Sequence, residues 1–346
     1  MFKQKVFHLF LVFWLLTAGK SFADAETPRQ ALTRAIKSGD LLQVQSFIES
    51  KKVAIDEVPE KTWKGTTPLV EAAASAQFDI IQYLLEKGAS IDGISGNYDT
   101  PLMKLIQEGS LKLTCQQLIE MVSFFINSGA KVNRTGESRY TPLMNACKYT
   151  QCTQLVEMLL DLGAKIDAQS SDENTAFLLC IRNTNIPAFR LLLKRGAKTS
   201  LTCKGSTPLG IAAEEGNIVM ARILIDELKA DVNEQDEIGS TPMIWAALNR
   251  QISMIAFLAE KGADINAKTP CAIHIIKPQD TADLWPRLSL SRTVIIFPKN
   301  STPLTFAKWS ASISKSLSAV NLICELGGIE FPHADLKEET QSTRYW

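Results

Sequence analysis

Histidine is scarce in this chain, with 3 copies in 346 residues. Because His8 lies in the apolar N-terminal segment, an acid–base or nucleophilic site would have only His274, His333 and carboxylates available. The sequence also has no Gly-x-Ser-x-Gly motif, no phosphate-binding glycine loop and no His-x-x-x-His pair. These absences argue against an enzyme, and we expect no catalytic residues and no cofactor.

An excess of either charge is also absent, because Lys plus Arg and Asp plus Glu number 37 each. A protein that binds DNA or RNA normally presents a basic face, so nucleic acid is not an expected partner. Beyond the N-terminus no apolar run approaches the length of a membrane helix. We therefore expect the mature chain to be soluble and monomeric, without stable insertion into a membrane.

The first 25 residues have the pattern of a signal peptide. Lys3 and Lys5 precede an apolar run from Val6 to Leu16, and Ala23-Asp24-Ala25 forms a small-x-small cleavage site before Glu26. The apolar run is too short to span a bilayer comfortably, which favours cleavage over an uncleaved anchor. We expect export to a bacterial periplasm or to the outside of the cell.

A Thr-Pro-Leu phrase, with Met once in place of Leu, returns six times and begins at Thr67, Thr100, Thr141, Thr207, Thr241 and Thr302. The proline positions differ by 33, 41, 66, 34 and 61, and Thr175-Ala176-Phe177 stands in the middle of the interval of 66. A threonine before proline predicts a helix start, because the hydroxyl caps free amides and proline at the first helical position loses no hydrogen bond. A period near 33 indicates a stacked array of helical units.

Each unit reads as a short first helix, a break and a more apolar second helix. In the unit that starts at Thr67 the apolar positions are Leu69, Ala72 and Ala73, then, after a break near Ala76, Ile80, Ile81, Leu84 and Leu85. The second helices end at Gly-Ala dipeptides, where glycine adopts the left-handed conformation of a helix stop; these begin at Gly88, Gly129, Gly163, Gly196 and Gly262. Short polar stretches such as 93–97 and 134–138 predict hairpin-like loops before the next Thr-Pro.

In this form the chain resembles the ankyrin repeat family over roughly residues 28 to 330. The resemblance implies an all-α solenoid of about seven to eight helix-turn-helix units with hairpin loops, and a non-catalytic function in binding other proteins. The histidine of the family's Thr-Pro-Leu-His motif is replaced here by Val70, Met103, Met144, Leu178, Gly210, Ile244 and Thr305. Because that histidine ties loop to helix, we expect looser coupling between neighbouring repeats.

We divide the chain into a signal peptide (1–25), an ankyrin repeat domain (26–330) and a polar tail (331–346). Within the domain we expect an atypical N-terminal repeat over 28–57, full repeats over 65–267, an insertion over 268–300 and an atypical C-terminal repeat over 301–330. The insertion contains two β-prone runs, 272–276 and 294–297, and we interpret it as a β-finger or small folded insertion; a degenerate repeat is the alternative. Eight further residues, around Ser110 to Gln117, lengthen the connection between the two helices of the second full repeat.

Seven cysteines do not predict a disulfide framework here, because the chain is long enough to build a core without one. Cys147, Cys180 and Cys324 occupy positions where the repeat places buried apolar side chains. The other four, Cys115, Cys152, Cys203 and Cys271, lie in or near loops, where an oxidising compartment would allow some of them to pair. Cys271 and His274 have the spacing of two metal ligands but no second pair nearby, so no metal is expected.

The family resemblance implies that the short first helices line a concave face, that the loops extend this face as fingers, and that a protein partner binds there. The partner-binding candidates are Trp63, Tyr98 and Tyr140 in the fingers, with Glu71, Lys104, Asn145 and Trp245 on the first helices. The alternatives are that the tyrosines brace their loops, that Trp245 packs between helices, and that Glu71, Lys104 and Asn145 form only a solvated face.

Three functions stay open on the sequence alone. The first is an exported, non-catalytic interaction module or scaffold whose protein partner is unknown. The second is a secreted effector that acts on host proteins, and the third is an enzymatic or metal site in the 268–300 insertion, which contains His274, Asp280 and Asp283. The sites Asn133-Arg134-Thr135 and Asn300-Ser301-Thr302 would accept sugar only in a eukaryotic secretory route.

Overall fold

The computed structural model describes residues 27–56, 65–93, 99–268, 273–276, 294–297, 302–303 and 337–339. The predicted signal peptide, nearly all of the predicted C-terminal repeat and most of the polar tail lie outside these residues. The chain forms two compact units, Met1–Lys131 and Val132–Trp346, so the single repeat domain predicted over 26–330 is described below as two parts.

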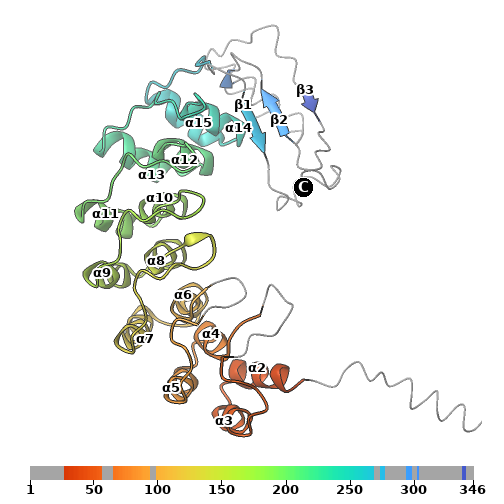
Figure 1. Ribbon diagram of the computed structural model, residues 1–346. Coiled ribbons are helices and arrows are strands. Elements are labelled where there is room, and N and C mark those ends of the chain that lie inside the picture. The colour runs from red at the N-terminus through yellow and green to blue at the C-terminus, as the bar shows by residue number, and fades with distance from the viewer. Residues whose placement is uncertain are drawn as a thin grey trace, which may run out of the picture. The chain divides into compact units, whose positions relative to one another are not determined.

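The first unit contains three helix pairs: α2 (Pro28–Ser38) with α3 (Leu41–Glu49), α4 (Pro68–Ala74) with α5 (Phe78–Glu86), and α6 (Pro101–Gln107) with α7 (Cys115–Asn127). The first helices α2, α4 and α6 lie side by side in one row, and α3, α5 and α7 form the second row (Figure 1). Each pair buries its apolar side chains against its neighbours. In the α4–α5 pair the fully buried members include Leu69, Ala72, Ile80, Ile81 and Leu84.

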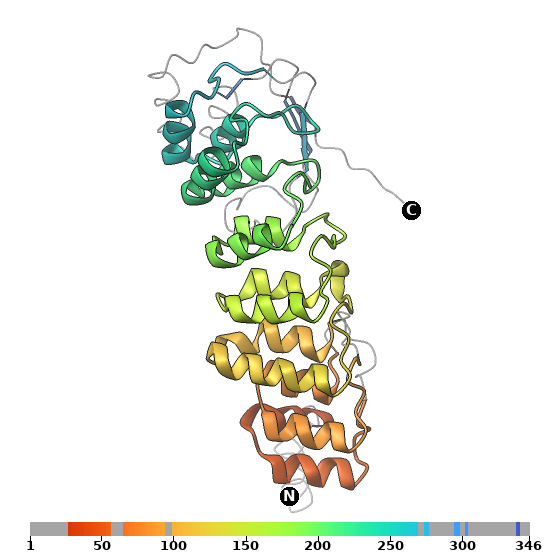
Figure 2. The same ribbon diagram turned by 90° about the vertical axis from the view of Figure 1, so that its left-hand side faces the viewer.

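The second unit contains four helix pairs: α8 (Pro142–Tyr149) with α9 (Thr153–Asp161), α10 (Ala176–Arg182) with α11 (Ile186–Lys194), α12 (Pro208–Glu215) with α13 (Ile218–Arg222), and α14 (Pro242–Leu248) with α15 (Ile252–Glu260). The first helices α8, α10, α12 and α14 again pack in sequence order, and Figure 2 shows the layers one above another. Seven helix pairs in the described residues confirm the all-α repeat architecture.

The threonine of the repeated phrase caps its helix, as the sequence predicts. Five threonine hydroxyls accept a hydrogen bond from the backbone amide three residues on, at 3.1 to 3.3 Å; they are Thr67, Thr100, Thr141, Thr175 and Thr207. Thr241 makes no such bond, and its buried hydroxyl has no partner in the described residues. Proline at the first helical position and the cap together fix where each first helix begins.

The Gly-Ala stops are also confirmed. Gly88, Gly129, Gly163, Gly196 and Gly262 all have φ between 84° and 102°, the left-handed region that L side chains rarely adopt. The alanine after each glycine donates its amide to a carbonyl five residues back, for example Ala197 to Leu192 at 3.0 Å, which closes the last turn. The predicted break after the first helix lies at Ala76, which has φ of 56°.

One repeat departs from this pattern at the end of its second helix. After α13 the chain makes a π-helical turn, η3 (Ile223–Glu227), and Lys229 with φ of 58° stands where the other repeats have glycine. The interval of 34 between Pro208 and Pro242 is one residue longer than 33. The π turn accommodates that extra residue without shifting the helix start or the stop.

The eight extra residues of the second full repeat are placed differently from the prediction. Seven residues separate α6 from α7 where three separate α4 from α5, and they include the 3₁₀ turn η1 (Gly109–Leu111). The remaining four residues lengthen the second helix, because α7 has 13 residues and α5 has 9. The prediction that all eight lengthen the connection was therefore wrong. Thr114 caps α7 reciprocally with Gln117, which starts the helix early.

Side-chain amides at the start of the second helices tie neighbouring repeats together. Asn185 donates its amide to the carbonyls of Cys147 and Thr150, at 3.3 and 2.8 Å. At the same place in the next two repeats, Asn217 donates to the Ile181 carbonyl and Gln251 to the Glu214 carbonyl. Each acceptor lies near the end of the preceding first helix, where carbonyls lack helical partners.

A second row of bonds lies at the turns that follow the Gly-Ala stops. In each case an Asp or Asn side chain accepts a backbone amide of the next repeat, and the pairs are Asp56 with Ser90, Asp92 with Lys131, Asn133 with Lys165, Asp167 with Lys198, and Asn233 with Asp264. The two rows show that coupling between repeats does not depend on the missing histidine alone. The prediction of looser coupling stays a prediction.

Within the predicted insertion the structure describes only two short strands. β1 (Ile273–Ile276) and β2 (Val294–Phe297) correspond to the two β-prone runs and pair antiparallel, with Ile273 opposite Phe297. A third strand, β3 (Lys337–Glu339), pairs antiparallel with β2. The connection between β1 and β2 lies outside the described residues, so the β-finger or small insertion stays a prediction.

Candidate protein-interaction surface

Glu71, the first of the predicted binding residues on a first helix, is held inside the first unit. Its side chain is 13% exposed, and its Oε1 lies 3.5 Å from Arg29 Nη2 and accepts a hydrogen bond from the Thr66 hydroxyl at 2.6 Å. Arg29 also donates to the Thr66 carbonyl. The buried oxygen Oε2 of Glu71 has no partner among the described residues. Glu71 therefore links α2 to the start of α4, and the solvated face proposed as an alternative does not describe it.

Lys104 occupies the same place on α6, and its side chain is 12% exposed. Its Nζ lies 3.3 Å from Asp99 Oδ2 and 3.0 Å from Glu108 Oε1. Burial lowers the pKa of Lys104, but the hydrogen bond to Glu108 and the charge of Asp99 together raise it above its ordinary value. The lysine is therefore a charged group whose charge is already balanced within the unit. Asn145, at this place on α8, is 3% exposed and is likewise not a solvated side chain.

Trp245 is half-buried on α14 and braces the loop before its own helix. Its indole Nε1 donates to Asp236 Oδ2 at 2.8 Å, while Asp236 Oδ1 accepts the Ser240 and Ile238 amides at 2.7 and 3.1 Å. Burial raises the pKa of Asp236, against the lowering effect of these donors. The arrangement gives Trp245 a structural role and leaves part of its ring available.

The fingers of the second unit are hairpin-like loops, as the sequence predicts. In four of them the amide of one residue donates to a carbonyl three or four positions on, at 2.9 to 3.1 Å; the pairs are Gly136 with Tyr140, Ser170 with Asn174, Cys203 with Ser206, and Asp236 with Ser240. Trp63 and Tyr98, the two other predicted aromatic anchors, lie outside the described residues. Tyr140 is the one predicted finger residue whose surroundings the structure shows.

Tyr140 belongs to a cluster with two residues at the end of α8. Lys148 Nζ lies 5.2 Å from the centre of the Tyr140 ring and 4.9 Å from that of the Tyr149 ring. Tyr149 is 36% exposed, whereas Tyr140 and Lys148 are half-buried. Burial raises the pKa of the Tyr140 hydroxyl. We call these three residues the Tyr-Lys-Tyr cluster.

The neighbouring repeats continue this exposed edge with charged groups that are already paired. Arg182, at the end of α10, lies 2.5 Å from Glu215 Oε1 and 3.5 Å from Glu214 Oε2, and both glutamates belong to the end of α12. In the fingers Lys204 Nζ lies 2.8 Å from Asp172 Oδ1. The sequence reasoning missed this edge because it considered the place four residues after the threonine. The sequence does contain a signal for this edge. The seventh and eighth residues after each repeat threonine are the last ones before the break between the two helices, and the exposed edge is formed there.

The cysteines divide into buried thiols and disulfide-bonded residues. Cys147 and Cys180 are fully buried, as predicted, and the pKa of Cys180 is raised well above its usual range by its hydrogen bond with Cys147 and by burial. Cys203 is 5% exposed and donates to the Asp172 carbonyl, and burial raises its pKa too. These three thiols are free, and the raised pKa values of Cys180 and Cys203 make those two weak nucleophiles. Cys115 and Cys152 are disulfide-bonded, whereas Cys271 and Cys324 lie outside the described residues.

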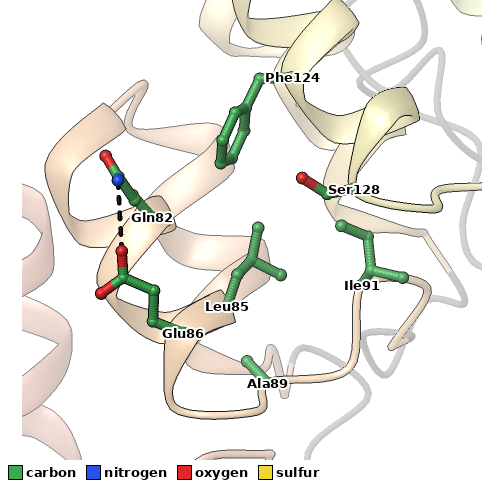
Figure 3. Close-up of a pocket in the computed structure, with 7 residues that line it drawn as sticks. All are labelled: Gln82, Leu85, Glu86, Ala89, Ile91, Phe124 and Ser128. Atoms are coloured by element: carbon green, nitrogen blue, oxygen red, sulfur yellow. Dashed lines mark hydrogen bonds between the residues drawn. The ribbon is translucent and has the colours of Figure 1, made fainter.

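A pocket of about 470 Å³ lies on the second-helix side of the first unit (Figure 3). Leu85, Ile91 and Phe124 give it apolar walls, and Gln82 donates to Glu86 at its rim at 3.2 Å. It is a secondary candidate for contact with a partner.

Two negative findings apply to the described residues only. None of their helices combines the length and apolar character that crossing a bilayer requires. Among the same residues no group of three or more His, Cys, Asp or Glu side chains is arranged to hold a metal ion.

Comparison with known proteins adds a family match over most of the chain. A family model described as ankyrin repeats, in three copies, matches residues 4–94, 92–170 and 177–269. The chain is 25% identical over 249 residues to the ankyrin repeat protein nuc-2 of Neurospora crassa, which covers 70% of this chain and 22% of that protein. It is 27% identical over 216 residues to alpha-latrocrustotoxin-Lt1a of Latrodectus tredecimguttatus, covering 62% of this chain and 13% of the toxin. The chain thus spans less than a quarter of the length of these relatives.

The fold is similar to that of the human ASB11 ankyrin repeat domain, a crystal structure. The TM-score is 0.54 at 23% identity, and the match covers 67% of this chain and 98% of that one. At this identity the likeness concerns the fold.

Proposed function

Because the chain belongs to the ankyrin repeat family, we propose that it is a non-catalytic protein-interaction module or scaffold that acts after export and binds a protein partner through its first helices and loop fingers. Ankyrin repeat domains generally serve as protein-interaction modules and are typically non-catalytic. The observation that carries the proposal is the stacking of helix pairs within each unit, three in the first and four in the second. The apolar side chains are buried between repeats, and the ends of the first helices stay accessible.

The second unit supports this surface best. There the ends of α8, α10 and α12 present Tyr149, Arg182 and Glu215 beside fingers that hydrogen-bond to one another, for example Ser171 to the Ser138 carbonyl at 2.7 Å. Fingers fixed in this way are pre-organised, so little conformational entropy is lost when a partner binds. An aromatic and charged rim over a rigid support has the composition of a protein-binding surface.

Export is supported by two independent features. The N-terminal sequence has the pattern of a signal peptide, and Cys115 and Cys152 are disulfide-bonded. Disulfides persist in oxidising compartments and are rare in the cytosol. We therefore propose a periplasmic or extracellular location for the mature chain.

Site-specific photo-crosslinking tests the binding proposal. A photoreactive side chain at Asn183, an exposed position after α10, samples the first-helix side, and the same side chain at Val219, 50% exposed on α13, samples the second-helix side. Mature protein made in its own compartment should form an adduct with a distinct partner protein from position 183 and much less from 219. Adducts from neither position, or from 219 alone, contradict the proposal.

Fractionation and thiol mapping test the location. The mature chain should be recovered outside the cytoplasm beginning at Glu26, with Cys115 and Cys152 protected from alkylation until a reductant is added. Cys203 should be alkylated without reductant once the chain is unfolded, because it is a free thiol. A cytoplasmic chain with an intact N-terminus would contradict export and leave the binding proposal in place.

A further inference from the structure

Lys148 differs from the other enclosed basic groups near the first helices in what surrounds it. Arg29, Lys104 and Arg182 each lie within 3.5 Å of a carboxylate oxygen. Lys148 is half-buried between the rings of Tyr140 and Tyr149. Among the described residues no carboxylate forms an ion pair with it. Its ammonium charge is thus oriented by the two rings and is not balanced by a carboxylate.

The position of Lys148 makes that charge usable by a partner. It lies on the last turn of α8, next to a finger and beside Tyr149, which is 36% exposed. The ring faces attract the ammonium group by cation–π interaction. The tyrosine hydroxyls can donate hydrogen bonds to a carboxylate. A half-buried setting strengthens an ion pair relative to one in open solvent, because the local dielectric is lower.

The charges around the Tyr-Lys-Tyr cluster limit what can bind. Arg182 is neutralised by Glu214 and Glu215, and Lys204 by Asp172, so the adjoining repeats add no net positive charge. A polyanion such as nucleic acid or an anionic membrane surface would place further negative charges close to these carboxylates, which would repel them. A single carboxylate in an otherwise uncharged segment meets none of them.

We propose that Tyr140, Lys148 and Tyr149 form the anchor site for one Asp or Glu side chain of the partner protein, presented in a short segment without other acidic residues. The inference rests on the proposed protein-binding function and specifies the chemistry of its partner. The carboxylate pairs with Lys148 Nζ, and the neighbouring partner side chain packs on the exposed Tyr149 ring.

Peptide selection tests the inference on the full mature chain. A random dodecapeptide library displayed on phage is selected against residues 26–346, and the recovered peptides are measured in solution as the free acid and with the acidic residue changed to Asn or Gln. The variants are Lys148→Met, Lys148→Arg and Tyr149→Ala. Lys165→Met is the matched control because Lys165 is an exposed lysine of the same unit. Circular dichroism confirms that each variant keeps its helix content.

We expect peptides with one acidic residue to be enriched, and their affinity to fall about tenfold or more in Lys148→Met and on amidation of the peptide. Lys148→Arg should stay within about threefold and Lys165→Met should be unchanged. Peptides that bind equally well to Lys148→Met, or a selection for several acidic residues, would overturn this inference while leaving the binding function intact. Recovery of no binding peptide, together with no photo-adduct, would overturn both. Retention of the chain on anionic phospholipid vesicles through Lys148 would also overturn it, in favour of a membrane surface.

Discussion

Asn185 uses one side-chain amide both to start a helix and to join two repeats. Its Oδ1 caps α11 by accepting the Ala188 amide at 3.3 Å, and its Nδ2 donates to the carbonyls of Cys147 and Thr150. Since the side chain is 1% exposed, Asn185→Ala leaves buried polar groups without partners. We expect a loss of about 2–3 kcal/mol of unfolding free energy, measured by urea denaturation.

The control for that substitution is Asn183→Ala, two residues away on the exposed end of α10. Asn183 donates only to the Leu179 carbonyl within its own helix, and water can replace that bond. Its removal should cost less than about 0.5 kcal/mol. Equal effects of the two substitutions would show that the bonds between repeats contribute nothing.

The left-handed stop positions give a pair of predictions of opposite sign. Gly196 has φ of 84° and nothing within 4 Å of an added Cβ, so Gly196→Ala should destabilise by about 1 kcal/mol through backbone strain alone. Lys229 already bears that strain at φ of 58°, so Lys229→Gly should be neutral or stabilising by up to about 1 kcal/mol. Thermal unfolding of both variants measures the difference, and destabilisation by both would contradict the account.

Asp236 gives a prediction about pH. Burial raises its pKa in the folded state, so the folded chain keeps the proton to a higher pH than the unfolded chain, in which Asp titrates near about 4. The contribution to stability is therefore full below that value and is lost as the pH rises through the folded pKa. Relative to wild type, Asp236→Asn should gain stability as the pH rises from about 4 through the folded-state pKa of Asp236, and urea denaturation at a series of pH values measures the gain. A constant difference would show that the N–H donors cancel the effect of burial.

At this scale the sequence predicted the backbone signals of each repeat well, whereas it did not show how charged side chains pair. The capping threonines and the glycine stops follow from local backbone chemistry, which is the same in every repeat. Glu71 and Lys104 were predicted at a binding face because they follow the Thr-Pro-Leu motif on the first helices, and that role stays a prediction. The structure adds that their charges are balanced by Arg29 and Asp99. These ion pairs join residues that are distant in sequence or that lie on a preceding loop. The spacing of apolar residues along the chain does not show which charged side chains will pair.

Among the elements, the π turn after α13 allows a sharp test. Deleting Leu228 aligns the sequence with that of the α10–α11 repeat and should convert η3 to a regular α-helix, with a change in stability below about 1 kcal/mol. Deletion of Ala188 in α11 rotates the later residues of that helix, including the buried Phe189 and Leu192, by about 100° and should unfold the repeat. Circular dichroism and urea denaturation compare the two, and equal damage would contradict the interpretation of η3 as an accommodated insertion.

The elements were predicted in number and order, but not in how insertions are absorbed. The interval of 41 between two prolines located eight extra residues without showing that four of them extend α7. Helix length depends on which apolar side chains find neighbours, and Phe124 and Phe125 of α7 do so, Phe124 in edge contact with Phe78 at 5.0 Å. Tertiary packing of this kind is not visible in the spacing.

For the whole molecule, stacking predicts that damage spreads only to neighbours. Phe177 is 1% exposed and stacks on Phe189 at 4.8 Å, so Phe177→Ala should cost about 3–5 kcal/mol within the α10–α11 pair. Hydrogen exchange should lose protection there first, then in α8 and α12, and least in α15. A uniform loss over all pairs of the second unit would indicate one cooperative block instead.

The array itself was the most predictable feature, because six repeated phrases at one period constrain the whole architecture. The bonds between repeats were not predicted. Asn217 and Gln251 were not singled out in the sequence, and only the stacked arrangement shows that their amides donate to a carbonyl 36 or 37 residues away. The units and their order could therefore be predicted from the periodicity, whereas the bonds between repeats become visible only in the folded chain.

Glycosylation of Asn133 in a eukaryotic expression host would disturb the hydrogen bonds that this side chain makes. Asn133 is the acceptor asparagine of a sugar-attachment sequon, yet its Nδ2 donates to the Gly163 carbonyl at 2.8 Å and its Oδ1 accepts the Lys165 amide at 2.8 Å. A glycan added while the chain enters the lumen of a yeast or animal cell would occupy the nitrogen that joins these two turns. Recombinant material secreted from such cells should thus be heterogeneous and less heat-resistant than material from bacteria, and Thr135→Ala should remove the difference.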